Sequence, residues 1–310
     1  MKKISVISGC YNEEGNLEEF YDRIKKVLIK YHDLDHEIII TDNASTDNSE
    51  NILKRLAKKD NKLKIIINNK NFGHIAPTLR AFNSATGNAV IAIASDLEDP
   101  PELIDQFISK WLEGKKIILG IREKSAEVGI MKHFRGAFYF LMQKTSSIKQ
   151  LKNFTGFGLY DEKFVKEFIK LNDPYPYFRG LIEDIGIPYD TIKYFKEYRK
   201  KGESKGSFFI YYDLAMLGIV NYSNVFLRSL TFLGFLLSLF SFCIAIYYLI
   251  QKLLNWYDFQ AGFVPMIILI SFFFGVLFIY LGLLAEQILY LKKFITRRPI
   301  VTEKERINFD

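Results

Sequence analysis

Cysteine and histidine are scarce in this sequence. Its 310 residues include two cysteines, Cys10 and Cys243, and four histidines, and they form neither a CxxC pair nor a Cys/His cluster with metal-ligand spacing. This scarcity excludes a disulfide scaffold and a structural zinc site. Internal repeats and low-complexity linkers are also missing. With 49% hydrophobic and 25% charged residues, the chain is neither disordered nor collagen-like.

Charge is missing from two long segments. Residues 229–250 contain no Asp, Glu, Lys or Arg over 22 positions, and residues 263–285 contain none over 23. Since a helix rises about 1.5 Å per residue, each segment is long enough to cross a hydrocarbon core of roughly 30 Å. The short connection between them predicts an antiparallel hairpin of two membrane spans. The alternative is a pair of buried core helices, but uncharged runs of this length are rare in soluble cores.

Basic residues flank this hairpin. Arg228 precedes it, and Lys292, Lys293, Arg297 and Arg298 follow it. The positive-inside rule therefore places both flanks in the cytosol, and we expect an integral protein of the cytoplasmic membrane with both termini cytosolic. The net charge of +7 favours an anionic partner. Because the basic residues lie beside the spans, a lipid bilayer explains this charge better than nucleic acid does.

Short apolar segments alternate with helical patterns in the first 120 residues. We expect strands at 4–8, 37–40, 63–67, 89–94 and 117–119, and helices at 14–30, 45–58, 76–85 and from 100 onward. Strand–helix alternation with nearly all-apolar strands predicts an α/β fold with a mostly parallel sheet covered on both faces. Ligands of such folds bind at the carboxyl ends of the strands.

Polar loops follow the first four expected strands. Their sequences are CYNEE (10–14), TDNASTD (41–47), NKNFGH (69–74) and SDLEDPPE (95–102). Helix capping and turn formation explain each loop taken alone. Four such loops on one edge of a sheet predict a binding site.

These loops resemble a known family. CYNEEGNL, TDNASTDNS, NKNFGHIAPTLRAF and SDLEDPPE resemble, in order, the VYNEE-type, DDGSTD, NFG-x-x-A and DxD-type segments of inverting glycosyltransferases of family 2. Further on, YFRGL (177–181) and YRKKGESK (198–205) resemble stretches of the polyprenyl-phosphate glycosyltransferases. That group includes dolichyl-phosphate mannose synthase and bactoprenol glucosyltransferase, and the latter has the same C-terminal two-span hairpin. The resemblance covers nearly the whole chain.

The resemblance implies a GT-A-type, mostly parallel sheet domain followed by a two-helix C-terminal transmembrane hairpin. We expect four regions: a cytosolic glycosyltransferase domain (1–206), a juxtamembrane amphipathic segment (207–228), the hairpin (229–291) and a basic cytosolic tail (292–310). A homo-oligomer is also implied.

The resemblance further implies a nucleotide-diphosphate sugar donor and a Mg²⁺ or Mn²⁺ ion, which neutralises the diphosphate leaving group. Asp42 would accept a hydrogen bond from the base, and Gly73 would let the backbone approach the ligand. The donor-binding residues are expected to be Tyr11, Asn12, Glu13, Asp42, Gly73 and Ser95. Asp96 and Glu98 are predicted to hold the metal, since alternate residues of an extended segment point the same way, and Asp96 is also counted as catalytic.

Three positions depart from the family pattern. Ala94 stands two residues before Asp96, where relatives carry an acid, so the ion would bind fewer protein carboxylates. Gly156 and Gly158 replace an acid and an arginine of many relatives, so no catalytic role is transferred to them. The identity of the sugar stays open.

A polyprenyl phosphate acceptor needs no general base, because the second pKa of a phosphate monoester is near 6 and the acceptor arrives ionised. The enzyme then mainly supplies positive charge and positioning. The candidates are Arg122, Arg135, Arg179, Arg199 and Lys205, and we favour the last three as catalytic residues. Attraction to anionic lipid headgroups is their alternative role.

The sequence thus favours inverting transfer of one sugar from a nucleotide sugar to a polyprenyl phosphate. A processive polysaccharide synthase of the same superfamily is one alternative, but the chain lacks the QxxRW segment and the additional spans of such enzymes. A non-catalytic membrane adaptor that retains nucleotide-sugar binding is the other, and Ala94 and Gly156 are consistent with it.

Overall fold

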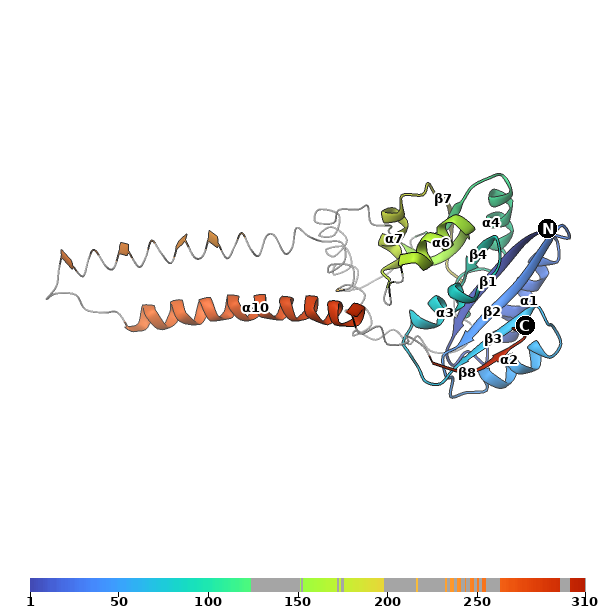
Figure 1. Cartoon of the computed structure of the whole chain (residues 1–310), viewed down its shortest axis with the longest axis horizontal. Helices are drawn as coiled ribbons and strands as arrows, with labels where there is room; N and C mark the ends of the chain where they lie inside the picture. Colours follow the sequence, from blue (N-terminus) through green and yellow to red (C-terminus); the bar gives the residue numbers. More distant parts are fainter. Residues whose placement is uncertain are drawn as a thin grey trace.

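The computed structural model describes residues 1–123, 151, 153–171, 173, 176–197, 263–295 and 302–309, together with isolated positions between 216 and 254. An α/β domain contains most of these residues (Figure 1). One long helix, α10 (Phe263–Ile295), leads away from this domain, and its C-terminal end lies toward the sheet.

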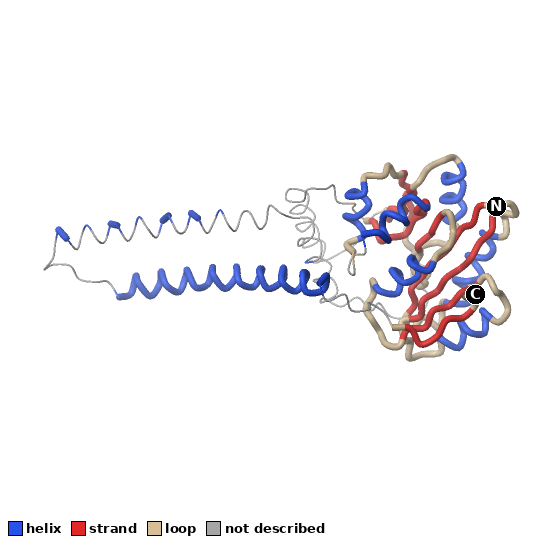
Figure 2. The backbone as a smooth tube through the Cα atoms, viewed as in Figure 1, coloured by secondary structure: helices blue, strands red, loops and turns tan. Residues whose placement is uncertain are grey.

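Eight strands form a single mixed sheet in the order β7-β5-β6-β4-β1-β2-β3-β8 (Figure 2). Their bounds are Lys2–Cys10 (β1), Leu34–Asp42 (β2), Leu63–Asn68 (β3), Ala89–Ala92 (β4), Ile117–Arg122 (β5), Phe154–Asp161 (β6), Asp190–Tyr194 (β7) and Glu303–Ile307 (β8). β1 is parallel to β2 and β4, β2 to β3, and β5 to β7, whereas β6 and β8 pair antiparallel. The carboxyl ends of β1 to β5 and β7 therefore share one edge of the sheet, which we call the carboxyl edge.

Helices cover both faces of this sheet, which confirms the predicted α/β class. The helices are α1 (Leu17–Leu28), α2 (Ser49–Ala57), α3 (Ala76–Ser84), α4 (Leu103–Leu112), α6 (Glu162–Leu171) and α7 (Phe178–Ile185). One apolar core contains residues of α1, α2 and α4, and a second core contains residues of α3, α6 and α7. Leu17, Phe20, Ile24 and Leu28 are all buried, as the spacing of apolar residues predicted for α1.

Helix α2 begins later than the sequence suggested. Its N-cap is Asn48, not Ser45, Thr46 or Asp47. The Asp47 side chain still accepts a hydrogen bond from the Ser49 amide at 3.0 Å. Ser45 and Thr46 instead bond to the loop that follows β1, so their polar groups hold two loops together.

Strand β8 completes the sheet beyond β3. Glu303 lies opposite Asn68 and Ile307 opposite Ile65, so β8 enters the sheet at the carboxyl end of β3. Residues 292–310, expected to be a basic tail, therefore include an edge strand. The charged sequence of β8 concealed it, because strands usually favour β-branched and aromatic residues. These charges find partners on the helices: Lys304 with Glu50, and Glu305 with Lys54.

The two expected membrane spans fall differently on the structure. Residues 229–250 are described only at isolated positions. Helix α10 begins at the start of the second expected span and continues beyond it to Ile295. Among the residues that the structure describes, no helix has the length and apolarity of a membrane span.

The start of β2 contains a buried carboxylate that joins three strands. Glu37 is 1% exposed and accepts hydrogen bonds from the Ser5 hydroxyl at 2.6 Å and the Thr86 amide at 2.8 Å. The ammonium groups of Lys3 and Lys64 each lie 2.9 Å from its Oε2. Burial raises the pKa of Glu37, but these hydrogen bonds and ion pairs outweigh burial and lower the pKa to about 2.

We expect this carboxylate to make the fold sensitive to acid. Because its pKa is depressed in the folded state, its stabilisation is complete above the ordinary value of 4.5 and is lost as the pH falls towards 2. Glu37 alone should contribute about 3 kcal/mol to the loss of unfolding free energy over this window. In Glu37→Gln this contribution should be absent, so the drop should be smaller by that amount, and stability at pH 7 should be lower. Urea unfolding of both proteins at pH 7 and pH 2.5 measures the difference, and equal drops would contradict the assignment.

Candidate active site

Polar loops follow the four central parallel strands at the carboxyl edge, as predicted. We call them the β1 loop (11–16), the β2 loop (43–48), the β3 loop (69–75) and the β4 loop (93–102). Hydrogen bonds run from each of these loops to a neighbouring loop or strand. Side chains that are engaged in these hydrogen bonds shape the loops and are less available to a ligand.

The β1 and β2 loops bind each other through Asn12 and Glu13. Asn12 has a φ of 53°, donates its amide to the Ser45 hydroxyl at 2.9 Å, and accepts the Thr46 amide at 2.7 Å. The Glu13 amide donates to the Ser49 hydroxyl at 2.9 Å, and its buried carboxylate accepts from Asn16. Both residues were predicted to bind the donor. The structure places them at the carboxyl edge, where they fix the shape of the two loops. Tyr11 lies half-buried beside them.

Asp42, the last residue of β2, is buried. Its Oδ1 accepts from the Cys10 thiol and the Ser45 hydroxyl, and its Oδ2 accepts from the Ser45 amide at 3.1 Å. Burial raises the pKa of Asp42, and the bonds from Ser45 offset only part of that rise. Burial together with the charges of Asp42 and Glu13 also raises the pKa of the Cys10 thiol well above its usual value. In this structure the carboxylate therefore organises the β2 loop, and base recognition by Asp42 stays a prediction.

Asn43 is a site residue that sequence reasoning missed. Its buried side-chain amide donates to Asn71 Oδ1 at 2.9 Å and to the Gly73 carbonyl at 3.0 Å. Its Oδ1 accepts from the Asn68 side chain at 3.0 Å and from the Phe72 amide at 3.1 Å. All four bonding positions are used, so Asn43 sets the conformation of the β3 loop. Its only sequence signal was membership of a polar loop.

Gly73 lies in the β3 loop, and the approach of its backbone to a ligand stays a prediction. Its φ is 84°, a conformation that residues with a Cβ rarely adopt, and no heavy atom lies within 4 Å of the place where a Cβ would stand. The β3 loop therefore presents bare backbone at the carboxyl edge.

The β4 loop turns where the sequence analysis assumed an extended segment. Leu97 is buried with a φ of 59°. Ser95, also buried, donates its hydroxyl to the Gly9 carbonyl at 3.0 Å, which joins the loop to β1. Asp96 is half-exposed, and its Oδ1 accepts the Glu98 amide at 3.1 Å.

The two predicted metal ligands have different partners. The Glu98 carboxylate forms ion pairs with Lys196 at 2.9 Å and Arg122 at 3.2 Å, whereas Asp96 bonds to the Glu98 backbone. That both carboxylates bind one ion stays a prediction, and the partners of Glu98 compete with that role. Within the described part of the chain, no three His, Cys, Asp or Glu side chains are grouped to hold a metal. Because Glu98 is already neutralised by two cations, we expect Asp96 to be the stronger candidate for a divalent cation.

Arg122 is held in place by the loop after β4. Its Nε and Nη2 donate to Asp99 Oδ1 at 2.9 and 2.7 Å, and Tyr194 also donates its hydroxyl to that oxygen. Although burial lowers the pKa of Arg122, Asp99 and Tyr194 raise it above its usual value, so the guanidinium stays charged. The pKa of the Tyr194 hydroxyl is raised, mainly by burial and secondly by the negative charge of Asp99. The sequence had offered Arg122 only as one phosphate-binding candidate.

Of the three favoured acceptor-binding residues, only Arg179 belongs to the part of the chain that the structure describes. Arg179 is the second residue of α7. Arg199 and Lys205 lie outside the described residues, as does Arg135. Their roles in binding the acceptor phosphate stay predictions.

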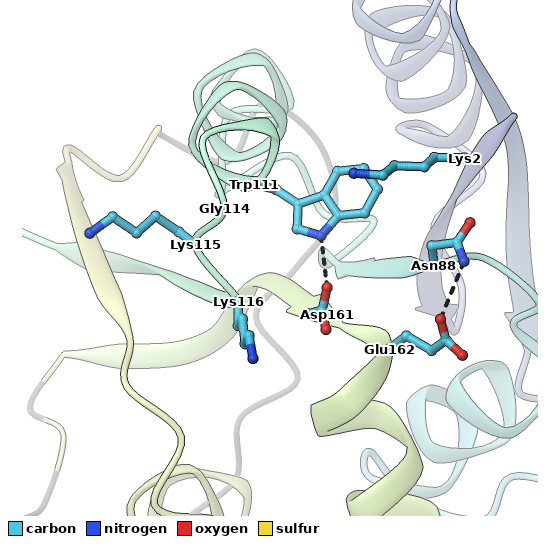
Figure 3. Close-up of a pocket in the computed structure, with 8 residues that line it drawn as sticks. All are labelled: Lys2, Asn88, Trp111, Gly114, Lys115, Lys116, Asp161 and Glu162. Carbon is cyan, nitrogen blue, oxygen red and sulfur yellow. Dashed lines mark hydrogen bonds between the residues drawn. The ribbon is translucent and has the colours of Figure 1, made fainter.

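A cavity of about 250 Å³ lies at the opposite edge of the sheet (Figure 3). Lys2, at the start of β1, and Asn88, just before β4, line it together with Trp111 and Asp161. The Trp111 indole N–H donates to Asp161 at 3.0 Å, and the Lys2 ammonium lies 5.0 Å from the centre of the Trp111 ring. None of the predicted site residues lines this cavity, so the candidate active site is the carboxyl edge.

Comparison with known proteins identifies the family. Residues 5–182, which include all four loops, match the model described as glycosyl transferase family 2. The chain belongs to glycosyltransferase family 2. This confirms the resemblance seen in the loop sequences, and the chain has the mixed, mostly parallel sheet that the resemblance implied.

Relatives match this glycosyltransferase over most of its length. It is 30% identical to the uncharacterized glycosyltransferase YkcC of Bacillus subtilis, with 92% of this chain and 88% of the relative covered. It is 28% identical to the SfII prophage-derived bactoprenol glucosyl transferase of Shigella flexneri, with 99% of each chain covered. Among solved structures, the mannosyltransferase PcManGT from Pyrobaculum calidifontis in complex with GDP-Man and Mn²⁺ is 15% identical. It has a TM-score of 0.47, with 96% of this chain and 88% of that chain covered.

Proposed function

We propose that this family 2 glycosyltransferase transfers a single sugar from a nucleotide-diphosphate sugar to a polyprenyl phosphate at the cytosolic face of the membrane. Relatives named bactoprenol glucosyl transferase, which cover 99% of this chain, support the class of acceptor. The four loops at the carboxyl edge are the proposed donor site.

The main structural support for this proposal is the short connection between α10 and β8. Helix α10 ends at Ile295, and β8 begins at Glu303, opposite the carboxyl end of β3. The residues between them span at most about 25–30 Å when extended. The end of α10 therefore lies within that distance of the carboxyl end of β3, at the carboxyl edge where we place the donor site. An acceptor held in a membrane around α10 would have its phosphate on the side of the domain that carries the four loops, which supports the proposal.

The character of α10 supports a membrane around it. Its first 23 residues carry no charge. Phe272, Phe274, Phe278 and Ile279 are between 53% and 66% exposed. Large apolar side chains that are exposed in such number are stable only against lipid or another apolar surface. We propose that the helix belongs to the hairpin anchor, with the α/β domain and both flanks of the hairpin in the cytosol.

The chemistry at this edge requires charge and positioning more than proton transfer. A phosphate oxygen of the ionised acceptor forms a bond to the anomeric carbon, and the bond from that carbon to the nucleoside diphosphate breaks with inversion. A bound Mg²⁺ or Mn²⁺, held by Asp96 together with the diphosphate and water, would neutralise the charge that develops on the leaving group. The β3 loop, shaped by Asn43 and open at Gly73, offers backbone to the donor.

The direct test is the product formed in membranes that contain the protein. They are incubated with a panel of labelled nucleotide sugars and undecaprenyl phosphate, and the extracted lipid is identified by mass spectrometry. We expect one nucleotide sugar to give a lipid carrying a single sugar, and membranes without the protein to give none. Longer sugar chains on the lipid would indicate a processive synthase. Nucleotide-sugar binding with neither hydrolysis nor transfer would indicate an adaptor.

A further inference from the structure

The segment that enters β8 contacts the β3 loop directly. The Asn69 amide donates to the Thr302 carbonyl at 2.9 Å, and the Asn69 side chain donates to the Glu303 carbonyl at 3.0 Å. Asn69 is the first residue of the β3 loop and therefore has its backbone and its side chain both bonded to the segment that follows α10. This contact is local and specific, because it involves one residue of the loop and two successive carbonyls.

The same loop is held from its other side by Asn43. The side chain of Asn43 forms hydrogen bonds with Asn68, Asn71, Phe72 and Gly73. The backbone amide of Asn43 donates to the Cys10 carbonyl at 2.9 Å. The β3 loop is thus fixed between the β2 loop and the start of β8. If β8 leaves the sheet, Asn69 loses both bonds to 302–303, and Asn43 alone orders the loop.

Strand β8 is anchored away from the loop as well. The Asn308 side chain donates to the carbonyls of Leu63 at 2.8 Å and Ala57 at 3.0 Å. Ile307 packs against the apolar core beneath α1 and α2, and Glu303 forms an ion pair with Arg80 of α3. These contacts fix the strand at both ends, so it can position Asn69 without support from the ligand.

We propose that β8 is a positioning element of the donor site, which couples the seating of the segment after α10 to the affinity for the nucleotide. The inference rests on the proposed function, because it assumes that the β3 loop contacts the nucleotide part of the donor. Docking of β8 orders the loop before the donor arrives and so reduces the entropic cost of binding. A donor bound to the ordered loop stabilises the docked strand by the same factor.

The test measures nucleotide binding by the full-length protein in lipid nanodiscs, with UDP and GDP as calorimetric probes. Asn69→Ala removes the side-chain bond to Glu303, and Ile307→Asp places a charge where β8 packs on the core. Lys304→Ala is the matched control, because Lys304 lies on the same strand and pairs only with Glu50 among the interactions described here. Hydrogen exchange of the β3-loop amides reports whether the loop has loosened.

We expect the dissociation constant of the bound nucleotide to rise about three- to tenfold in Asn69→Ala, the loss of one neutral hydrogen bond. It should rise more in Ile307→Asp and stay within twofold in Lys304→Ala. Exchange of the β3-loop amides should accelerate in the first two variants. In transfer assays the KM for the donor should rise while the rate at saturating donor stays near that of the wild type, a split that general unfolding does not produce.

Wild-type affinity in Asn69→Ala, with faster exchange of the β3 loop, would overturn the inference and leave the proposed function standing. If Ile307→Asp fails to fold, Asn69→Ala decides alone, since Asn69 is exposed and its truncation leaves no cavity. A wild-type protein that binds neither nucleotide would instead contradict the proposed donor class, and this inference would fail with it.

Discussion

Sugar transfer should fall at least a hundredfold in Asp96→Asn, with the fold intact. Asp96 is half-exposed at the carboxyl edge, and its Oδ1 accepts the Glu98 amide, a bond that an asparagine oxygen also makes. The substitution therefore removes the charge and leaves the turn in place. Neutralising a diphosphate leaving group is worth several kcal/mol, and each 1.36 kcal/mol is tenfold in rate. The measurement is kcat/KM for the donor across a Mn²⁺ and Mg²⁺ titration.

Two further variants sharpen this result. Glu98→Gln should cost less than tenfold, because the structure engages this carboxylate with Lys196 and Arg122. Ala94→Asp restores the acid of the family pattern on an exposed position, and should lower the metal concentration needed for half-maximal transfer. Full activity of Asp96→Asn in EDTA would remove the metal from the mechanism. A loss in Glu98→Gln as large as in Asp96→Asn would show that Glu98 leaves its ion pairs to bind the metal.

The second large effect concerns the acceptor. Replacing polyprenyl phosphate by the corresponding polyprenol should abolish transfer, because a free alcohol needs a general base and an ionised phosphate does not. Transfer should also rise with pH through the second pKa of the acceptor phosphate, near 6. Both results are measured as labelled lipid product per unit time. Efficient glycosylation of the polyprenol would demand a general base and contradict this account.

The basic residues at 199–205, which we expect to lie near a membrane, provide a matched comparison for the same prediction. Arg199→Ala and Lys205→Ala should each lower transfer about 10- to 150-fold, the loss of one charge-assisted phosphate contact. Lys200→Ala and Lys201→Ala should cost far less, because we assign these side chains to anionic headgroups. Equal, partial losses in Lys200→Ala, Lys201→Ala and Lys205→Ala that anionic lipid restores would reduce Lys205 to a surface role.

The central sheet could be predicted because its signals are local. Strands β1 to β5 are short apolar runs bounded by turns, and all of them were expected. Strand β6 was hidden by its glycines: at Gly158 a Cβ would stand 2.6 Å from the Ile118 carbonyl, so close packing requires the residue that weakens a strand pattern. Strand β8 was hidden by charges, which are paired only after the strand docks.

The site could be located from the sequence, but its internal bonds could not. Strand order places four polar loops at one edge, and that step needs only the α/β pattern. The ion pairs of Glu98 depend on cations from β5 and from the segment after β7, and the left-handed turn at Leu97 is not visible in the sequence. Asn43 likewise acts through a loop 25 or more residues further along the chain. Such pairings arise from tertiary structure and leave no periodic signal.

The pairing of β8 with β3 also sets an order of events during synthesis. Arg306 lies opposite Ile66, so the outer side of β3 gains its partner only after the chain as far as β8 has left the ribosome. At a synthesis rate of about 5–20 residues per second, the backbone groups on the β8 side of β3 stay unpaired for on the order of ten seconds or more. An unpaired strand edge is a template for pairing with other chains. The apolar α10 segment is made before β8, so under the proposed membrane anchoring, insertion of the chain and protection of its sheet from aggregation become successive steps of one process.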